Sequence, residues 1–230
     1  MRTIALINQK GGCGKTTVAL HLATAFQAGG SDTLIIDLDP QASAAEWHDA
    51  RQQPLPHVES VQPARLAKVI EHAREIGTEI LVLDTAPHSE AAALEAARAA
   101  DLVLVPCQPS IMDLRAMSKT VDLLKLVRVP AVAILNGIQP HGTIADEAAE
   151  TIENDLGLTV CPVRLGSRVA FNRCLITGQA AQEVEPKGKA AQEIEQLHKW
   201  TCEHLTMSAV AHLKQLTGAH DEQSLRRRSA

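Results

Sequence analysis

Long apolar runs are missing from this sequence of 230 residues. No stretch approaches the roughly 18 to 20 apolar residues that a membrane-spanning helix needs. The first residues enter a strand-like pattern without a charged and apolar leader. These absences argue against a membrane-spanning or secreted protein, and we expect a soluble, cytoplasmic one.

Paired cysteines are missing as well. The five cysteines include no C-x-x-C pair, and none of the ten histidines lies at zinc-ligand spacing from them. We therefore expect a reduced chain without a structural metal. The sequence also has no G-x-S-x-G segment, no Cys/His dyad and no carboxylate pair in a hydrolase context, so these forms of catalysis are not expected.

Aromatic residues are scarce, because tyrosine is absent and the chain has only two tryptophans and two phenylalanines. All four lie in helical patterns and are expected in the core or at an interface. The formal net charge is -5 and the isoelectric point is near 6.0. This acidic balance argues against a protein whose whole surface coats nucleic acid, but it is compatible with a local basic patch.

The apolar residues that are present make up 45% of the chain, enough for one large domain with a sizeable core. Short β-branched runs alternate with longer helical stretches. This pattern predicts a doubly wound α/β domain, with a mostly parallel sheet and helices on both faces. The predicted strands are residues 2–8, 33–37, 58–61, 80–84, 102–106, 131–136 and 158–161. The predicted helices are residues 15–28, 64–76, 90–99, 110–128, 143–155 and 190–205. We expect the domain to span residues 1–216 and residues 217–230 to form a flexible tail.

The segment at residues 8–17 reads NQKGGCGKTT and lies between the first predicted strand and the first predicted helix. Its glycines allow backbone N–H groups to turn inward, and the amino terminus of the following helix attracts an anion. Lys15 is expected to reach the β and γ phosphates of a nucleotide, and the Thr16 hydroxyl to ligate magnesium. Cys13 occupies the variable position of the loop, which requires only a small side chain. The loop residues expected to bind the nucleotide are Gly11, Gly12, Cys13, Gly14, Lys15, Thr16 and Thr17.

The loop departs from the strict P-loop pattern G-x-x-x-x-G-K-[ST], because Gln9 occupies the position of the first glycine. Residues 10–17, KGGCGKTT, instead resemble the deviant Walker A motif KGGxGKTT of the ParA/MinD family of ATPases. Residues 37–41, DLDPQ, resemble the DxDPQ segment of that family. Residues 84–87, DTAP, resemble its Walker B and switch II segment.

The resemblance extends from Arg2 to roughly Leu197 and implies a P-loop NTPase type of fold that binds ATP and Mg²⁺. It also implies a homodimer that forms with ATP. In that dimer each subunit sends Lys10 across the interface to the partner's phosphates, while Lys15 stays in its own site. The catalytic residues would then be Lys10, Lys15 and Asp39, with Asp39 orienting the attacking water.

The metal-binding residues implied by the resemblance are Thr16, Asp37 and Asp84, with the carboxylates acting through water. Asp37 would also support switch I, although a carboxylate at a strand end is about as often only a turn residue. Asn136 and Pro162 would contact the adenine. A strand-capping amide is the alternative for Asn136.

The resemblance leaves several uses of the ATP cycle open, and the sequence favours some of them. Residues 207–216 are only modestly amphipathic and residues 226–228 lack an apolar face, which argues against MinD-like membrane cycling. The missing cysteine pair argues against an iron-sulfur carrier, and Lys10 argues against a biosynthetic ligase. We expect a partition ATPase without an N-terminal helix-turn-helix domain, which segregates plasmid or chromosomal DNA. The alternatives are a ParA-like ATPase that positions a protein cargo over the nucleoid and a MinD-like membrane-cycling regulator.

The partners expected from the resemblance are non-specific DNA and a centromere-binding adaptor of ParB or ParG type that stimulates slow hydrolysis. No stable membrane association is expected, and the protein would associate with the nucleoid. For any single basic residue, solvated surface charge is the simpler explanation. The candidates for DNA contact are Arg164, Arg168, Arg173, Lys187 and Lys189, followed by Lys199, Lys214 and residues 226–228.

Overall fold

The computed structural model describes residues 1–206. The expected tail at residues 217–230, the stretch at residues 207–216 with Lys214, and the basic residues 226–228 lie outside the described residues.

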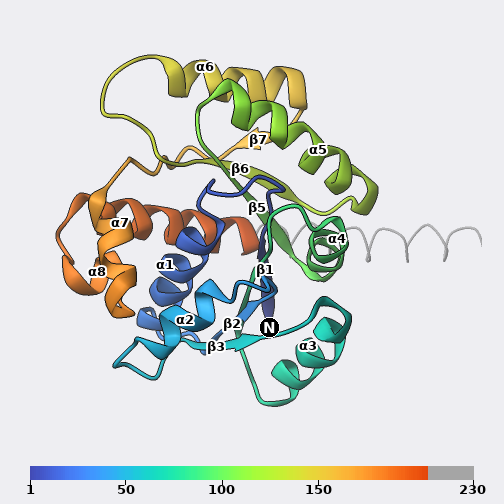
Figure 1. Cartoon of the computed structure of the whole chain (residues 1–230), viewed down its shortest axis with the longest axis vertical. Helices are drawn as coiled ribbons and strands as arrows, with labels where there is room; N and C mark the ends of the chain where they lie inside the picture. The colour runs from blue at the N-terminus through green and yellow to red at the C-terminus, as the bar shows by residue number, and fades with distance from the viewer. Residues whose placement is uncertain (207–230) are drawn as a thin grey trace, which may run out of the picture.

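Seven strands form one sheet in the order β3-β2-β4-β1-β5-β6-β7, and every neighbouring pair is parallel. Parallel strands need crossover connections, and helices supply most of them (Figure 1). The carboxyl ends of all strands therefore meet at one edge of the sheet, where doubly wound folds bind their ligands. The strands are β1 (Arg2–Leu6), β2 (Thr33–Asp37), β3 (His57–Ser60), β4 (Ile80–Asp84), β5 (Leu102–Cys107), β6 (Ala131–Leu135) and β7 (Thr159–Val160).

The central strands are buried on both faces, because successive side chains point into two separate cores. In β1, Ile4 and Leu6 join one core, and Ala5 joins the other together with Ile7, the residue after the strand. This explains why the strands read as nearly continuous apolar runs.

Helices cover the two faces in separate groups (Figure 1). The first face carries α1 (Lys15–Ala28), α2 (Ser43–Asp49), α7 (Val169–Arg173), η3 (Cys174–Thr177), α8 (Ala181–Val184) and a helix over residues 189–206. The second face carries η1 (Pro63–Arg65), α3 (Leu66–Glu75), α4 (Glu90–Ala99), α5 (Ile111–Val127), α6 (Ile144–Thr151) and η2 (Ile152–Leu156).

The predicted doubly wound architecture is confirmed, and the predicted strands and long helices exist with small shifts at their ends. The prediction omitted α2, α7, η3 and α8, which are all short. No helix within residues 1–206 has both the length and the apolar character to cross a bilayer.

We predict that Leu104→Ala lowers the free energy of unfolding by about 2 to 5 kcal/mol, because Leu104 is fully buried on a central strand and alanine would leave a cavity. The matched control is Leu126→Ala on α5, whose side chain is 81% exposed, and its effect should stay within about 0.5 kcal/mol. Urea denaturation followed by circular dichroism measures both. Equal destabilisation by the two substitutions would contradict the assigned core.

Candidate phosphate-binding site

The loop between β1 and α1 has the backbone shape of an anion cradle. Gly12 and Gly14 have φ angles of 75° and 98°, which favour glycine over any other residue. Gly14 is the N-cap of α1 and offers no side chain to the first turn of the helix, which also contains no acidic residue. The orphan N–H groups and positive dipole of this helix end therefore remain available to phosphate oxygens.

Amide side chains from two neighbouring strand ends hold this loop in place. Gln108 Nε2 donates to the Gly12 carbonyl at 3.1 Å, and Asn136 Nδ2 donates to the Cys13 carbonyl at 2.9 Å. A Cβ atom added at Gly14 would overlap Asn136 Nδ2, so Gly14 is required by close approach as well as by its backbone angle. Asn136 thus supports the phosphate loop, and its predicted contact with adenine remains a prediction.

The two lysines of the loop occupy different environments. Lys15 is only 6% exposed, and its Nζ donates to the Lys10 carbonyl at 3.0 Å, which holds the ammonium against the loop. Lys10 reaches away from the loop, and its Nζ lies 2.5 Å from Asp113 Oδ2 at the start of α5. Asp113 is buried and also accepts a hydrogen bond from the Ser110 hydroxyl. Sequence reasoning did not identify Asp113, although S-x-x-D at the start of a predicted helix is a capping signal that could have marked it.

Asp37 and Asp84 end neighbouring strands and lie directly opposite each other in the sheet register. The carboxylate of Asp37 accepts hydrogen bonds from backbone N–H groups: Oδ1 accepts from Asp39 at 3.0 Å, and Oδ2 accepts from Ala44 at 2.9 Å and from Ala45 at 3.3 Å. These bonds fix the switch I segment and the first turn of α2. The carboxylate of Asp37 thus joins the end of β2 to the segment before α2, and its predicted role in metal binding through water remains a prediction.

Asp84 has different surroundings from Asp37. It is fully buried, and neither of its oxygens has a hydrogen-bond partner within residues 1–206. Burial raises the pKa of Asp84 to about 7, and the negative charge of Asp37 adds to this, whereas the Thr16 hydroxyl and Lys15 oppose it. A buried, unpaired carboxylate beside a threonine hydroxyl fits a magnesium ion. Thr16 and Asp84 would hold that ion, Asp84 through water.

Asp39 lies in the switch I segment and is partly buried. Its Oδ1 accepts a hydrogen bond from the backbone N–H of Gln41 at 2.9 Å, and its Oδ2 has no partner among the described residues. One oxygen is therefore positioned and the other is available to a water molecule, consistent with the predicted role.

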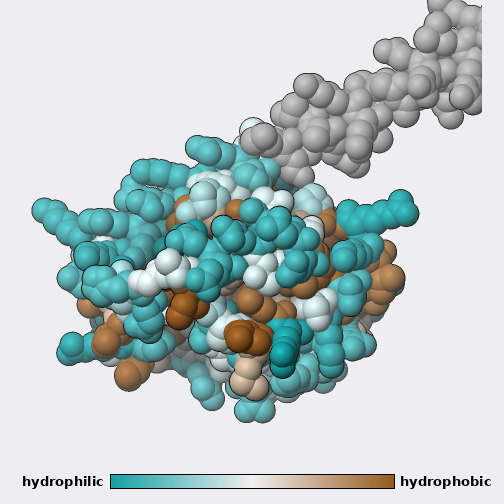
Figure 2. Space-filling model, turned by 90° about the horizontal axis from the view of Figure 1, so that it is seen from above, coloured by the Kyte–Doolittle hydropathy of each residue, from teal (hydrophilic) through white to brown (hydrophobic). Residues whose placement is uncertain are grey.

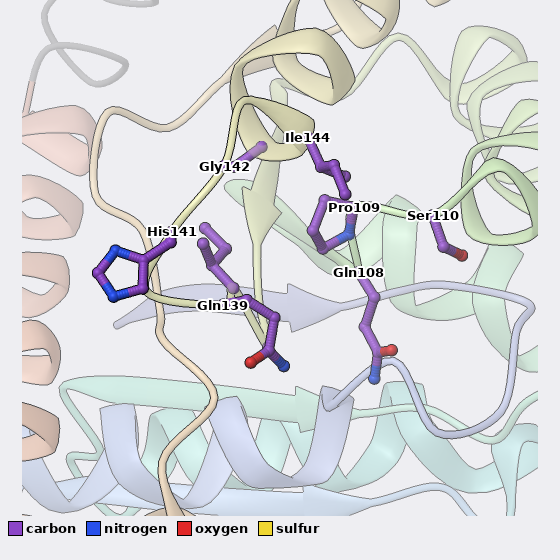
Figure 3. Close-up of a pocket in the computed structure, with 10 residues that line it drawn as sticks. Gln108, Pro109, Ser110, Gln139, His141, Gly142 and Ile144 are labelled. Carbon is purple, nitrogen blue, oxygen red and sulfur yellow. The ribbon is translucent and has the colours of Figure 1, made fainter.

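A small cavity of about 170 Å³ lies beside the loop, at the ends of β5 and β6. Figure 3 shows the side chains of Gln108 and Gln139, which line it, extending in the same direction, with Pro109 and Ile144 close together above them in the view. Pockets for whole ligands are usually about 300 to 1,000 Å³. This cavity therefore suits only part of a nucleotide. Pro162, the other predicted adenine contact, is exposed just after β7.

The basic residues considered for DNA contact are not equivalent. Arg164 pairs with Asp146 at 2.7 Å, and Arg168 donates through two nitrogens to Glu193 at 2.7 and 3.1 Å. Both guanidinium groups are thus already neutralised within the chain. Lys199 likewise pairs with Glu195 at 2.7 Å. Three other candidates are exposed and form no ion pair within the described residues; they are Arg173, Lys187 and Lys189.

Comparison with known proteins agrees with this geometry. The sequence profile of the CobQ/CobB/MinD/ParA nucleotide binding domain matches residues 4–180. The chain is 26% identical over 208 residues to the maintenance of carboxysome distribution protein A of Halothiobacillus neapolitanus, covering 85% of this chain and 94% of that protein. It is 31% identical over 157 residues to the chromosome-partitioning ATPase Soj of Thermus thermophilus, covering 56% of this chain and 63% of that protein.

The fold also resembles that of solved structures. The cell division ATPase MinD of Pyrococcus furiosus superposes with a TM-score of 0.70 at 20% identity, covering 88% of this chain and 98% of that one. At this identity the likeness establishes the fold, which is the P-loop NTPase type of the MinD proteins.

We predict that Asp84→Asn reduces the pH dependence of stability in the absence of nucleotide and metal. The pKa of Asp84 is about 7 in the folded chain and 3.8 in its unperturbed state, so between these values the folded state holds a proton that the unfolded state releases. The free energy of unfolding should therefore fall as pH rises through this window, by up to about 1.4 kcal/mol per pH unit for one proton.

Urea denaturation at pH 5, 6 and 7 measures this slope. Asp122→Asn on α5 is the control, because that carboxylate is 76% exposed and its removal should leave the slope unchanged. An unchanged slope in Asp84→Asn would show that Asp84 ionises normally in the folded chain.

Proposed function

Because the chain belongs to the CobQ/CobB/MinD/ParA nucleotide-binding family and is an ATPase of the ParA/MinD type, we propose that it uses ATP to position a large protein assembly over the nucleoid. The observation that carries this proposal is the length of the match to the carboxysome distribution protein, which includes 94% of that relative. The match to the Soj partition ATPase includes 63% of that relative. A protein cargo is therefore favoured over the plasmid or chromosomal DNA that the sequence first suggested.

Segregation of DNA is the second candidate. It is supported by the higher identity to Soj, 31%, over the part of the chain that aligns. Both candidates use the same nucleotide cycle, and they differ only in what the adaptor protein connects to the ATPase.

The residues of the phosphate loop suit the binding and transfer of a phosphoryl group. The backbone N–H groups of the loop and Lys15 would hold the β and γ phosphates, and Asp39 would orient the attacking water. Bound Mg²⁺, held by Thr16 and through water by Asp84, would neutralise charge on the phosphate oxygens. The protein's own contribution is position and charge, since no residue here has to form a covalent bond.

The position of Lys10 supports a role outside its own site. Its ammonium pairs with Asp113 at the start of α5, beside Ile111 and Met112, which are 70% and 76% exposed. Two neighbouring apolar side chains at such exposure favour burial against another surface. We infer that a second copy of the chain covers them when ATP is bound and that Lys10 then leaves Asp113 for the phosphates of the partner subunit.

The remaining partners are non-specific DNA, which would hold the ATP dimer on the nucleoid, and an adaptor protein that links the dimer to its cargo and stimulates hydrolysis. The net charge of -5 supports DNA binding by the dimer only, because two small basic patches must act together on one polyanion.

We predict that Lys15→Ala abolishes nucleotide binding, whereas Lys10→Ala changes ATP affinity less than about threefold and mainly loses ATP-dependent dimerisation. Titration with a fluorescent ATP analogue and light scattering measure the two effects. The control is Lys125→Ala, an exposed lysine on α5, which should change neither. Equal loss of ATP affinity in the two loop variants would refute this division of roles.

We predict that deleting the gene in its source organism causes a regularly spaced protein assembly to collapse into clusters, while replicated chromosome and plasmid markers still separate. Fluorescence imaging of the native assembly and of labelled DNA loci in the same cells measures both. Restoring the wild-type gene should restore the spacing, and a Lys15→Ala gene should not. Mis-segregated DNA with normally spaced protein assemblies would instead support DNA partition.

A further inference from the structure

An apolar groove lies on the first face of the sheet, where α7, η3 and α8 meet. Its volume is about 690 Å³, and it is lined by residues of these three elements and of the turns between them. Three apolar side chains on its rim are unusually exposed: Val169 is 80%, Ile176 is 79% and Val184 is 55% exposed. On the face that Figure 2 shows, apolar side chains form separate patches among hydrophilic ones. Exposed apolar side chains grouped like Val169, Ile176 and Val184 mark a surface that binds another molecule.

The charges around the groove differ from those of the chain as a whole. Glu183 is neutralised by Arg51, whose guanidinium donates to both of its carboxylate oxygens at 2.5 and 2.8 Å. Arg173 lines the groove and forms no ion pair within residues 1–206, and Lys187 and Lys189 follow within five residues of its last lining residue, Glu185. Among the residues that the structure describes, residues 169–189 thus keep three cations and one anion without an ion pair, in a chain whose net charge is -5.

We propose that this groove docks an acidic, amphipathic segment of a partner protein, with its apolar side chains against Val169, Ile176 and Val184 and a carboxylate on Arg173. Apolar anchors in a groove with a charged rim are the usual way in which an amphipathic helix is bound. DNA would match the cations but not the three apolar side chains, because protein–DNA interfaces are more polar. The proposed function identifies this partner as the adaptor, and the inference rests on it to that extent.

The wall of the groove is joined to α2, the helix that follows the switch I segment. This connection gives docking a route to the nucleotide. The Gln179 carbonyl in the groove wall accepts a hydrogen bond from Trp47 Nε1 of α2 at 3.0 Å. The adjacent Gly178 carbonyl accepts one from Arg51 at 2.8 Å. A Cβ atom added at Gly178 would overlap the backbone of Arg51, so the turn after η3 and the end of α2 are in direct contact.

The other end of α2 is tied to the catalytic segment. The Asp37 carboxylate that binds the first turn of α2 also accepts from the N–H of Asp39. A segment that shifts the turn after η3 would therefore act on the position of Asp39 through one short helix.

The test uses a fluorescent helical peptide of about 16 residues with leucines at i, i+3, i+4 and i+7 and glutamates between them. A twin peptide carries lysine in place of every glutamate. Fluorescence anisotropy with the full chain should show that the acidic peptide binds about tenfold tighter or more than its twin.

Two variants locate the binding. The double variant Val169→Ser with Ile176→Ser should weaken the acidic peptide at least about tenfold, and Arg173→Glu should remove the preference for the acidic peptide. The matched control is Leu126→Ser, an 81% exposed leucine on the opposite face, which should not change either affinity. Equal binding of the two peptides, or equal weakening by the control, would overturn the proposal.

Two further measurements separate the other possible occupants. The double variant should still dimerise with ATP in light scattering and still bind a labelled DNA duplex of random sequence. Loss of the dimer would show that a second copy covers the groove, and loss of DNA binding would show a DNA surface. Either result would overturn the proposal.

The peptide measurements use the purified chain and are independent of the cargo. If the acidic peptide binds to the groove as expected while the deletion strain mis-segregates DNA, only the proposed function fails. If the acidic peptide shows no preferred binding to the groove while protein assemblies cluster in the deletion strain, only this inference fails.

Discussion

The shape of the phosphate loop depends on hydrogen bonds from amide side chains at the ends of two other strands. Gln108 and Asn136 satisfy the carbonyls of Gly12 and Cys13, which have no partner in a helix or strand. Cys13 is buried, and a buried carbonyl without a partner costs about 1 to 3 kcal/mol, whereas the bond to the Gly12 carbonyl lies at the exposed side of the loop. With both carbonyls engaged by amide side chains, the N–H groups of the loop remain for the ligand. The site is therefore formed before any nucleotide arrives.

The strand order connects this loop to the switch segments. Because β4 lies between β1 and β2, the ends of these three strands are adjacent, and Asp37 and Asp84 face each other across one pair. The backbone N–H of His88, after β4, donates to the Gln9 carbonyl in the loop at 3.0 Å. Among the described residues, the Asp37 carboxylate accepts hydrogen bonds from three backbone N–H groups, and the Asp84 carboxylate accepts none. The two carboxylates therefore have different surroundings, although both end apolar strands in the same way.

Much of the fold and of the phosphate site could be predicted from the sequence, because both depend on residues that are close together in the chain. Apolar strands buried on both faces, and a glycine-rich loop between strand and helix, depend on neighbours in the chain. The start of α2 does not depend on its sequence neighbours alone, because it follows Ala42 at a φ of 54° and its first turn is capped by Asp37 from another element. The partners of Lys10 and Asn136 were also beyond prediction, because Asp113 and the Cys13 carbonyl are about a hundred residues away from them in the chain. Pairings at that separation are set by the sheet order.

The scarcity of aromatic residues has a practical consequence at α2. Without tyrosine, the intrinsic ultraviolet fluorescence of the chain comes almost entirely from Trp47 and Trp200. The indole of Trp47 is nearly buried, donates to the Gln179 carbonyl and lies under the Arg51 guanidinium, 4.8 Å from the ring centre. A cation and a hydrogen bond on the same ring make its emission sensitive to small displacements of α2. With Trp200 replaced by phenylalanine, the chain would carry a single tryptophan, Trp47 on α2, and the nucleotide cycle could be followed in real time without any attached dye.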